Sequence, residues 1–180
     1  MLKKIFAPLA TVFASVMLFI PALHAADAAS PIKNCLPQNL QGDAKFDWQQ
    51  FHGKVVYVDF WASWCGPCRE SFPFMNELQK DFPNELVVLG VSVDAEKADA
   101  ERFLAKTPAE FSLAIDTTGV CPKEFAVKGM PSTYILGPQG QLLFSHKGFR
   151  RSDTEKLREK VSEILKATAG SDQSAKVGSL

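Results

Sequence analysis

Apolar runs and the polar breaks between them divide the middle of the chain into two strands and a helix. Residues 55–60 are β-branched or aromatic in a nearly unbroken run, which is typical of a strand buried on both faces. Residues 86–93 form a second run of the same kind. Between them, residues 65–80 predict a helix that Pro73 kinks and that ends before Pro83.

Shorter elements are predicted on both sides of this strand–helix–strand unit. They are a helical turn over 48–51 that Gly53 ends, a helix over 95–106, a strand over 111–115, a short helix over 119–126, a hairpin of strands over 133–136 and 142–146, and a last helix that Ser152 caps and Gly170 ends. Two apolar strands joined through a helix form a parallel pair, and helices on both faces of the sheet make an α/β sandwich. In such sheets the chemistry lies beyond the carboxyl ends of the strands, where Cys65 follows the first strand.

The first 25 residues have the pattern of a secretory signal. Lys3 and Lys4 precede an apolar run over 5–20, and a stretch of small residues leads to an expected cleavage site after Ala25. An uncleaved membrane anchor is the alternative, because the apolar run is only slightly short of a membrane span. We therefore expect an exported, periplasmic protein.

The chain is long enough for one domain with a full core. The expected parts are a signal over 1–25, a polar arm over 26–40, a single domain over 41–169 and a disordered tail over 170–180. Basic and acidic residues each number 20, so no net charge recruits nucleic acid or an anionic surface. We expect a monomer.

Export changes how the four cysteines are interpreted. In an oxidising compartment, cysteines form disulfides or act as redox catalysts. Cys65 and Cys68 form a C-x-x-C pair, whereas Cys35 and Cys121 are solitary. A zinc site would need a second close pair or histidines at ligand spacing, and the histidines of this chain stand alone. We therefore expect neither a metal nor another cofactor.

The C-x-x-C pair opens a helix directly after a buried strand. Unpaired N–H groups and the positive end of the helix dipole stabilise a thiolate, so we expect a lowered thiol pKa at Cys65. Cys68 lies one turn further along the same face, within disulfide reach. Pro67 suits the first turn, where its missing N–H leaves nothing unpaired. An inert disulfide is the alternative, but a bridge over three residues closes too small a loop to stabilise much.

Asp59 places a carboxyl group within the first buried strand, six residues before Cys65. Burial makes the carboxylate costly and raises its pKa, which suits an acid–base group working near neutral pH. We expect Asp59 to accept the proton of Cys68 when that thiol attacks. The alternative is a hydrogen-bonded structural carboxyl group at a strand end.

The sequence of residues 58–68, VDFWASWCGPC, resembles the active-site signature of thioredoxins. Pro73 resembles their helix-kinking proline, and residues 129–133, GMPST, resemble the loop whose cis-proline faces the dithiol. With the signal and a helix–strand insertion over 94–119, the chain is similar to the exported TlpA/ResA-like branch of the thioredoxin superfamily. The resemblance covers about residues 46–167.

This resemblance implies a thioredoxin-like three-layer sandwich with a central mixed sheet, and it implies roles for the matching residues. Cys65 is the attacking cysteine and Cys68 the resolving one. Met130, before the cis-proline, offers backbone groups to an extended substrate segment, a form of strand addition. The residues implied to contact the substrate are Trp64, Gly66, Pro67, Met130 and Pro131.

One feature bears on the charge of Asp59, and another on the direction of the reaction. The lysine that partners the buried carboxyl group in thioredoxins falls at Gly90, which leaves the charge balance of Asp59 open. Gly66–Pro67 is the dipeptide of reducing members, so we expect reduction of protein disulfides, with electrons from a DsbD- or CcdA-like membrane carrier. Apocytochrome c, as in cytochrome c biogenesis, is one candidate substrate. The alternatives are a disulfide isomerase or oxidase of the same fold, or a protein that binds Cu(I) through the same cysteines.

Cys35 and Cys121 are left over after the C-x-x-C pair is assigned. In an exported chain the simplest expectation is a structural disulfide that ties the arm to the domain. Two free thiols, or an auxiliary pair that exchanges with Cys65, are the alternatives.

Overall fold

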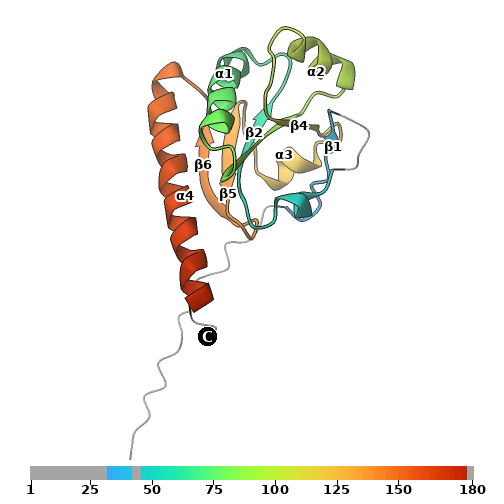
Figure 1. The fold of residues 1–180 in the computed structure, drawn as a ribbon. Coiled ribbons are helices and arrows are strands. Elements are labelled where there is room, and N and C mark those ends of the chain that lie inside the picture. Colours follow the sequence, from blue (N-terminus) through green and yellow to red (C-terminus); the bar gives the residue numbers. More distant parts are fainter. Residues whose placement is uncertain (1–31, 42–45, 178–180) are drawn as a thin grey trace, which may run out of the picture.

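A six-stranded mixed sheet forms the centre of the protein (Figure 1). In spatial order its strands are β1 (Gln38–Asn39), β4 (Ser112–Ile115), β3 (Leu86–Ser92), β2 (Val55–Trp61), β5 (Ser132–Leu136) and β6 (Leu142–Lys147). The neighbours β2, β3 and β4 are parallel, as predicted for the first two, and the remaining pairings are antiparallel. This computed structural model describes residues 32–41 and 46–177, so the predicted signal lies outside the described residues.

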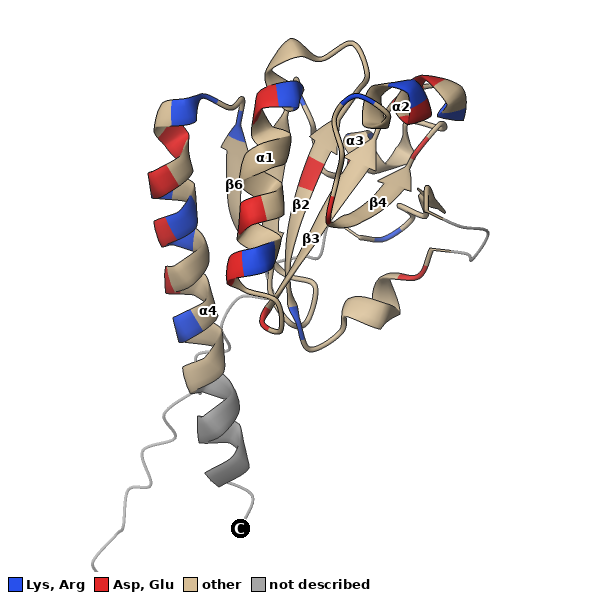
Figure 2. Ribbon diagram, turned by 45° about the horizontal axis from the view of Figure 1, so that its top comes forward, with Lys and Arg blue, Asp and Glu red and all other residues tan. Residues whose placement is uncertain are grey.

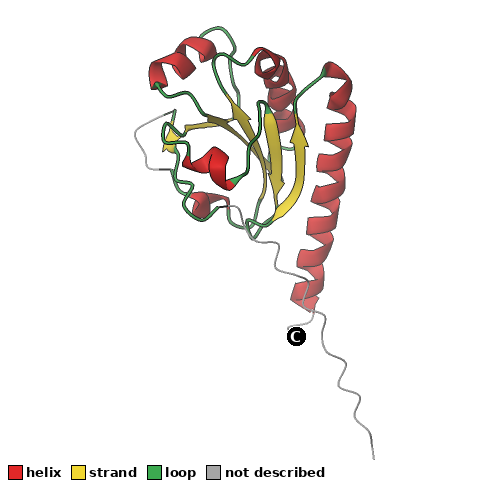
Figure 3. Ribbon diagram, turned by 180° about the vertical axis from the view of Figure 1, so that it is seen from behind, coloured by secondary structure: helices red, strands yellow, loops and turns green. Residues whose placement is uncertain are grey.

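Helices cover both faces of the sheet. The helices are α1 (Gly66–Asp81), α2 (Lys97–Leu104), α3 (Val120–Glu124) and α4 (Thr154–Val177), with short 3-10 helices η1 (Trp48–Phe51) and η2 (Arg151–Asp153). Figure 1 shows α1 and α4 against one face, and Figure 3, seen from behind, shows α3 in front of the other. The predicted α/β sandwich is thereby confirmed.

The alternation of side chains along β2 explains why both faces are filled. Val55, Tyr57 and Trp61 belong to the core under α1, α2 and α4. The intervening Val56 and Phe60 belong to the second core, under α3 and the N-terminal arm. Because all seven residues of β2 are buried, any polar side chain on this strand lies inside the protein.

The two ends of the fold differ from the sequence predictions. In the arm, which shows no hydrophobic period, Gln38–Asn39 pairs with β4. The prediction that Ser152 caps the last helix is wrong, because Ser152 lies inside η2 and α4 begins at Thr154.

The predicted helix end at Gly170 is also wrong, because α4 continues to Val177. An interior glycine costs a helix only about 1 kcal/mol, and a Cβ added at Gly170 would meet no heavy atom of the described residues within 4 Å outside the helix's own backbone. The expected disordered tail therefore does not begin at residue 170, and residues 178–180 lie outside the described part of the chain. Within that part, no helix is both long enough and apolar enough to span a membrane.

Candidate active site

Cys65 and Cys68 form a disulfide at the start of α1. Cys65 is the N-cap of the helix, and its Sγ accepts a hydrogen bond of 3.2 Å from the Cys68 N–H. The first turn of α1 contains no acidic residue, so the positive end of the helix dipole is not neutralised there. This environment favours negative charge on the Cys65 sulfur once the disulfide is reduced.

The two sulfurs differ in how they meet the surface. In the disulfide form, Cys68 is fully buried and Cys65 is 4% exposed, so neither residue is freely accessible to solvent. Gly66 and Pro67 between them are exposed, and Trp64 is 71% exposed. The reactive bond therefore lies just below the exposed first turn of α1 and next to one large, exposed apolar side chain.

Asp94, at the carboxyl end of β3, holds the segment that leads into Cys65. Its two carboxylate oxygens accept hydrogen bonds from the Ser63 backbone N–H at 2.9 Å and the Ser63 hydroxyl at 2.8 Å. A further bond of 2.8 Å comes from the Ser92 hydroxyl. Asp94 was not among the predicted site residues, although an acidic residue directly after a buried parallel strand was a usable signal.

The loop before β5 reaches the same end of the sheet. β5 runs antiparallel to β2 and pairs Ser132 with Phe60, so the residues just before Ser132 lie beside the end of β2. The Met130–Pro131 peptide is cis, which sequence spacing alone could not establish. The Pro131 carbonyl accepts a hydrogen bond of 2.8 Å from the Gly148 N–H, which fixes this loop to the end of β6.

Asp59 lies in the middle of β2, on the face covered by α1. Its side chain is on the same face of β2 as those of Tyr57 and Trp61, which are two residues away on either side. Cys68 belongs to the same core as Tyr57 and Trp61. Its Oδ1 atom is buried without a hydrogen-bond partner among the described residues. Desolvation by burial raises the pKa of Asp59 from 3.8 to about 8, so this group changes its protonation near neutral pH.

The charge of Asp59 also affects its neighbour Tyr57. Burial, and then the nearby Asp59 carboxylate, raise the pKa of Tyr57 well above its ordinary value, while its contact with Thr133 acts in the opposite direction. The Tyr57 hydroxyl lies 3.2 Å from Thr133 Oγ1, so both polar groups of this pair are partnered. Tyr57 therefore stays neutral, and Asp59 is the titratable group of this buried cluster.

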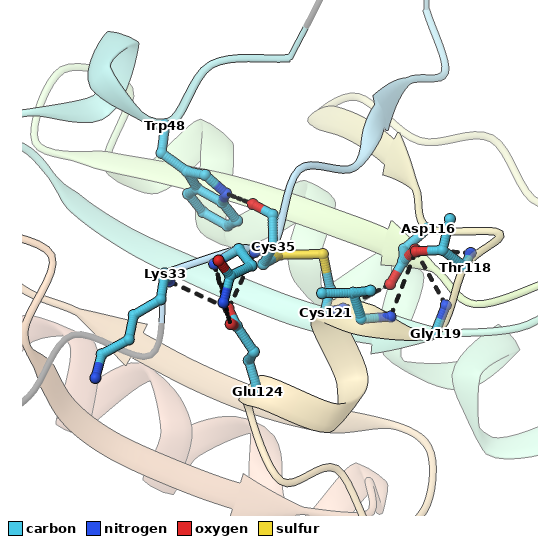
Figure 4. The surroundings of a disulfide bond; sticks show 10 residues. Lys33, Cys35, Trp48, Asp116, Thr118, Gly119, Cys121 and Glu124 are labelled. Carbon is cyan, nitrogen blue, oxygen red and sulfur yellow. Dashed lines mark hydrogen bonds between the residues drawn. A yellow bond between two sulfur atoms is a disulfide. The ribbon is translucent and has the colours of Figure 1, made fainter.

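Cys35 and Cys121 form a second disulfide, on the opposite face of the sheet (Figure 4). The Glu124 carboxylate accepts hydrogen bonds from the backbone N–H groups of Lys33, Asn34 and Cys35, at 2.9–3.1 Å. These bonds, that of the Asn34 N–H foremost, lower the pKa of Glu124. The arm is thus held to α3 by one covalent bond and one carboxylate.

The structure brings most of the predicted site residues together and leaves one pair apart. Those within β2, at its carboxyl end or next to that end are Asp59, Trp64, Cys65, Gly66, Pro67, Cys68, Met130 and Pro131. Cys35 and Cys121 belong to the other core, separated from Cys65 by the sheet. An exchange between the two pairs would require the buried second disulfide to become exposed.

Comparison with known proteins supplies the family. The sequence profile described as Redoxin matches residues 24–161, which is more than half of the chain. The chain belongs to the Redoxin family. It is 30% identical over 135 residues to the "Thiol-disulfide oxidoreductase ResA" of Bacillus thuringiensis subsp. konkukian, covering 74% of this chain and 73% of that protein.

Two further relatives are thioredoxin-like or thiol:disulfide interchange proteins as well. The "Thioredoxin-like protein YneN" of Bacillus subtilis is 37% identical over 114 residues, covering 62% of this chain and 66% of that one. A solved structure described as a putative thiol:disulfide interchange protein DsbE from Chlorobium tepidum is 42% identical, with a TM-score of 0.68 over 72% of this chain and 92% of that one. This Redoxin family member is therefore a thiol–disulfide oxidoreductase of the thioredoxin superfamily, on the ResA-like branch.

Proposed function

We propose that this oxidoreductase acts outside the cytoplasm and reduces protein disulfides through Cys65 and Cys68. The observation that carries the proposal is the position of this pair. It begins α1 after the buried strand β2, with the cis Met130–Pro131 loop reaching the same end of the sheet. A mobile substrate segment has access to the bond at Gly66 and Pro67, which form the exposed first turn of α1.

The reaction consists of two thiol–disulfide exchanges. The Cys65 thiolate attacks one sulfur of the substrate disulfide, which forms a mixed disulfide and releases the first substrate thiolate. Cys68 then loses its proton and attacks the Cys65 sulfur, which forms the Cys65–Cys68 disulfide and releases the second substrate thiolate. Two electrons pass from the protein to the substrate, the Cys68 proton moves to Asp59, and the two substrate thiolates take up protons from the solvent.

Asp59 provides the proton acceptor for the second exchange. It lies on the same face of β2 as Tyr57 and Trp61, whose core also contains the buried Cys68, and its pKa of about 8 keeps it in the range where it can gain or lose a proton. No cation of β3 is opposite Asp59, because the residue in register is Gly90. The carboxyl group is therefore tuned by burial instead of by an ion pair.

Reduction of each substrate leaves Cys65 and Cys68 oxidised, so turnover requires a dithiol donor that returns two electrons and two protons. The proposed donor is a DsbD- or CcdA-like membrane carrier, and the proposed substrates are proteins with disulfides, apocytochrome c among them. The N-terminal pattern supports export, with cleavage after Ala25. Mass spectrometry of the protein isolated from cells, with cell fractionation, tests that site against an uncleaved anchor.

Trapping is the decisive test of function. In cells that express Cys68→Ser, mixed disulfides formed on Cys65 cannot be resolved and accumulate as covalent adducts that a reductant releases. We expect such adducts with exported proteins, and none in a Cys65→Ser, Cys68→Ser control. Equilibration with glutathione then gives the reduction potential of the Cys65–Cys68 pair and with it the direction of the reaction. A potential of about −270 mV is that of a reductant, and one of about −120 mV is that of a strong oxidant.

A further inference from the structure

The charges around the reactive disulfide are distributed unevenly. Residues 126–132 and 147–152 together hold four basic residues and no acidic one: Lys128, Lys147, Arg150 and Arg151. On the other side of the site, residues 95–106 hold three basic and three acidic residues. Four of those six are joined in the ion pairs Lys97–Glu101 and Arg102–Asp99. Among these segments the excess positive charge therefore lies on the side of residues 126–132 and 147–152, although the whole chain has no net charge. On the α2 side, Arg69 of α1 adds a single cation, whose guanidinium lies 5.6 Å from the centre of the Phe103 ring.

Backbone contacts place these basic residues around the Met130–Pro131 loop. Lys128 lies two residues before Met130, and Lys147 is in register with Ser132, directly after Pro131. The hydrogen bond from the Gly148 N–H to the Pro131 carbonyl brings the segment that follows β6 against the loop. Figure 2 shows the corresponding blue segments at the end of β6 and just before α4, at the end of the molecule where α1 begins.

The basic residues differ in how far their charge is already compensated. The Arg151 guanidinium lies 3.7 Å from the Glu70 carboxylate on α1. Lys128, Lys147 and Arg150, which we call the basic rim, are exposed, and within the described part of the chain none of them takes part in an ion pair. Asp153, the nearest acidic residue in sequence, accepts a hydrogen bond from the Arg150 backbone N–H. The charge of the rim is thus available to a partner.

We propose that the basic rim selects polypeptide substrates that carry acidic residues next to the disulfide to be reduced. The inference rests on the proposed reduction by Cys65 and Cys68. A substrate segment that pairs with the Met130 backbone would lie near Lys128, two residues before Met130, and near Lys147 and Arg150, whose segment is bonded to the Pro131 carbonyl. Acidic residues of the substrate that face the basic rim accelerate the encounter and fix the register of the substrate against the Met130 loop, whereas basic substrate segments are repelled.

The test compares three synthetic peptides that share one intramolecular disulfide and differ in four flanking residues, which are all Asp, all Ser or all Lys. Fully reduced protein is mixed with each peptide, quenched with acid, and the peptide dithiol is measured by chromatography. Each rate is divided by the rate of the same peptide with dithiothreitol, which removes the effect of the flanking charges on the disulfide itself. We expect the normalised rate of the acidic peptide to exceed that of the basic one about 10-fold at low salt, and less than about 2-fold at 0.5 M salt.

Charge-reversal variants locate the preference. In the double variant Lys128→Glu, Lys147→Glu, we expect the normalised rate of the acidic peptide to fall below that of the basic peptide. Lys166→Glu is the matched control, because Lys166 is an exposed lysine further along α4, and its ratio of these two rates is expected to equal that of the wild type.

The outcomes separate this inference from the proposed function. If the wild type reduces none of the peptides, the reductase function itself fails. If it reduces the serine peptide but shows no order among the three, only the selectivity is overturned. Equal normalised rates for the three peptides, together with sedimentation of the protein on phosphatidylglycerol vesicles, would show that the basic rim binds lipid headgroups. That result would overturn the inference.

Discussion

Asp59 on β2 is directly opposite Gly90 on β3 in the parallel register, so the buried carboxyl group faces a position without a side chain. The space at Gly90 is already filled, because an added Cβ would lie 3.0 Å from the Phe111 ring and 3.2 Å from Trp61 Nε1. A lysine at this position could not reach Asp59 without displacing that core. The absence of a paired cation is therefore built into the packing between the two strands, and burial alone sets the pKa of Asp59.

Replacing Asp59 by asparagine should stabilise the oxidised protein at neutral pH. The pKa of Asp59 is about 8 in the folded state and 3.8 ordinarily, so the folded state holds the proton more tightly. The contribution of Asp59 to the free energy of unfolding is therefore most favourable below about pH 4, and it falls as the pH rises towards 8. We expect Asp59→Asn to gain about 2–4 kcal/mol at pH 7 and much less at pH 4. Urea unfolding across this range measures it, with exposed Glu159→Gln as the control that should show no such trend.

The same variant should slow the chemistry at one step only. Without the carboxylate, Cys68 has no buried proton acceptor, so the mixed disulfide on Cys65 should form at the normal rate and resolve about 10²-fold more slowly. Rapid mixing of reduced protein with a disulfide peptide, followed by acid quench, resolves the two steps. Equal resolution rates in wild type and Asp59→Asn across pH 6–9 would show that Asp59 has only a structural role.

In the reduced protein, Cys65 should react with iodoacetamide at least about 10-fold faster than Cys68 at pH 7. Cys65 caps the helix and retains some exposure, whereas Cys68 is fully buried. Peptide mass spectrometry at short reaction times gives both rates, and unfolding in guanidinium chloride should make them equal. A faster Cys68 would reverse the proposed roles.

Asp94 should position the loop before Cys65 without taking part in the chemistry. In Asp94→Ala, the Ser63 N–H, the Ser63 hydroxyl and the Ser92 hydroxyl lose their shared acceptor, which should cost about 1–3 kcal/mol of stability. The loosened loop should also slow alkylation of Cys65, an effect that a purely structural change elsewhere would not produce. The surface variant Asp99→Asn, which removes an exposed ion pair on α2, is the control and should change neither quantity appreciably.

The sequence predicted those parts of the fold that depend on continuous local patterns. The nearly unbroken apolar run of β2, the helix α1 with Pro73 inside it and the turn between β5 and β6 all appear where expected. The Cys65–Cys68 pair was found for the same reason, because its spacing and its place after a buried strand are local features.

The remainder depends on contacts between distant segments. β1 is two residues long and exists because Gln38 pairs with Ile115, a relationship that no periodicity reveals. Asp94 gains its role from a loop that is about 30 residues earlier in the chain. The bonds from the arm to Glu124 likewise join residues that are 89–91 positions apart. Register and side-chain direction across the sheet are needed to predict such contacts.

The Cys35–Cys121 disulfide should be structural and should resist conditions that open Cys65–Cys68. Both of its cysteines are buried, at 1% and 0% exposure, and the bond is covered by the arm and by Trp48, whose indole N–H donates to the Cys35 carbonyl at 2.7 Å. Cys65–Cys68 instead lies beside the exposed Trp64 and the exposed first turn of α1, which makes it the bond that exchanges readily.

The bond closes a loop with a sequence separation of 86 residues, for which the loss of chain entropy in the unfolded state amounts to about 4–5 kcal/mol. We therefore expect Cys35→Ser, Cys121→Ser to lose stability of this order in urea while its first exchange rate at Cys65 stays within about 2-fold of the wild type. Non-reduced peptide mapping after treatment with a mild reductant provides the direct measurement. A peptide that still links Cys35 to Cys121 when Cys65 and Cys68 are free agrees with a structural bond. Recovery of Cys35 cross-linked to Cys65 would instead identify the second pair as an electron relay, in which the arm must leave the sheet during each cycle.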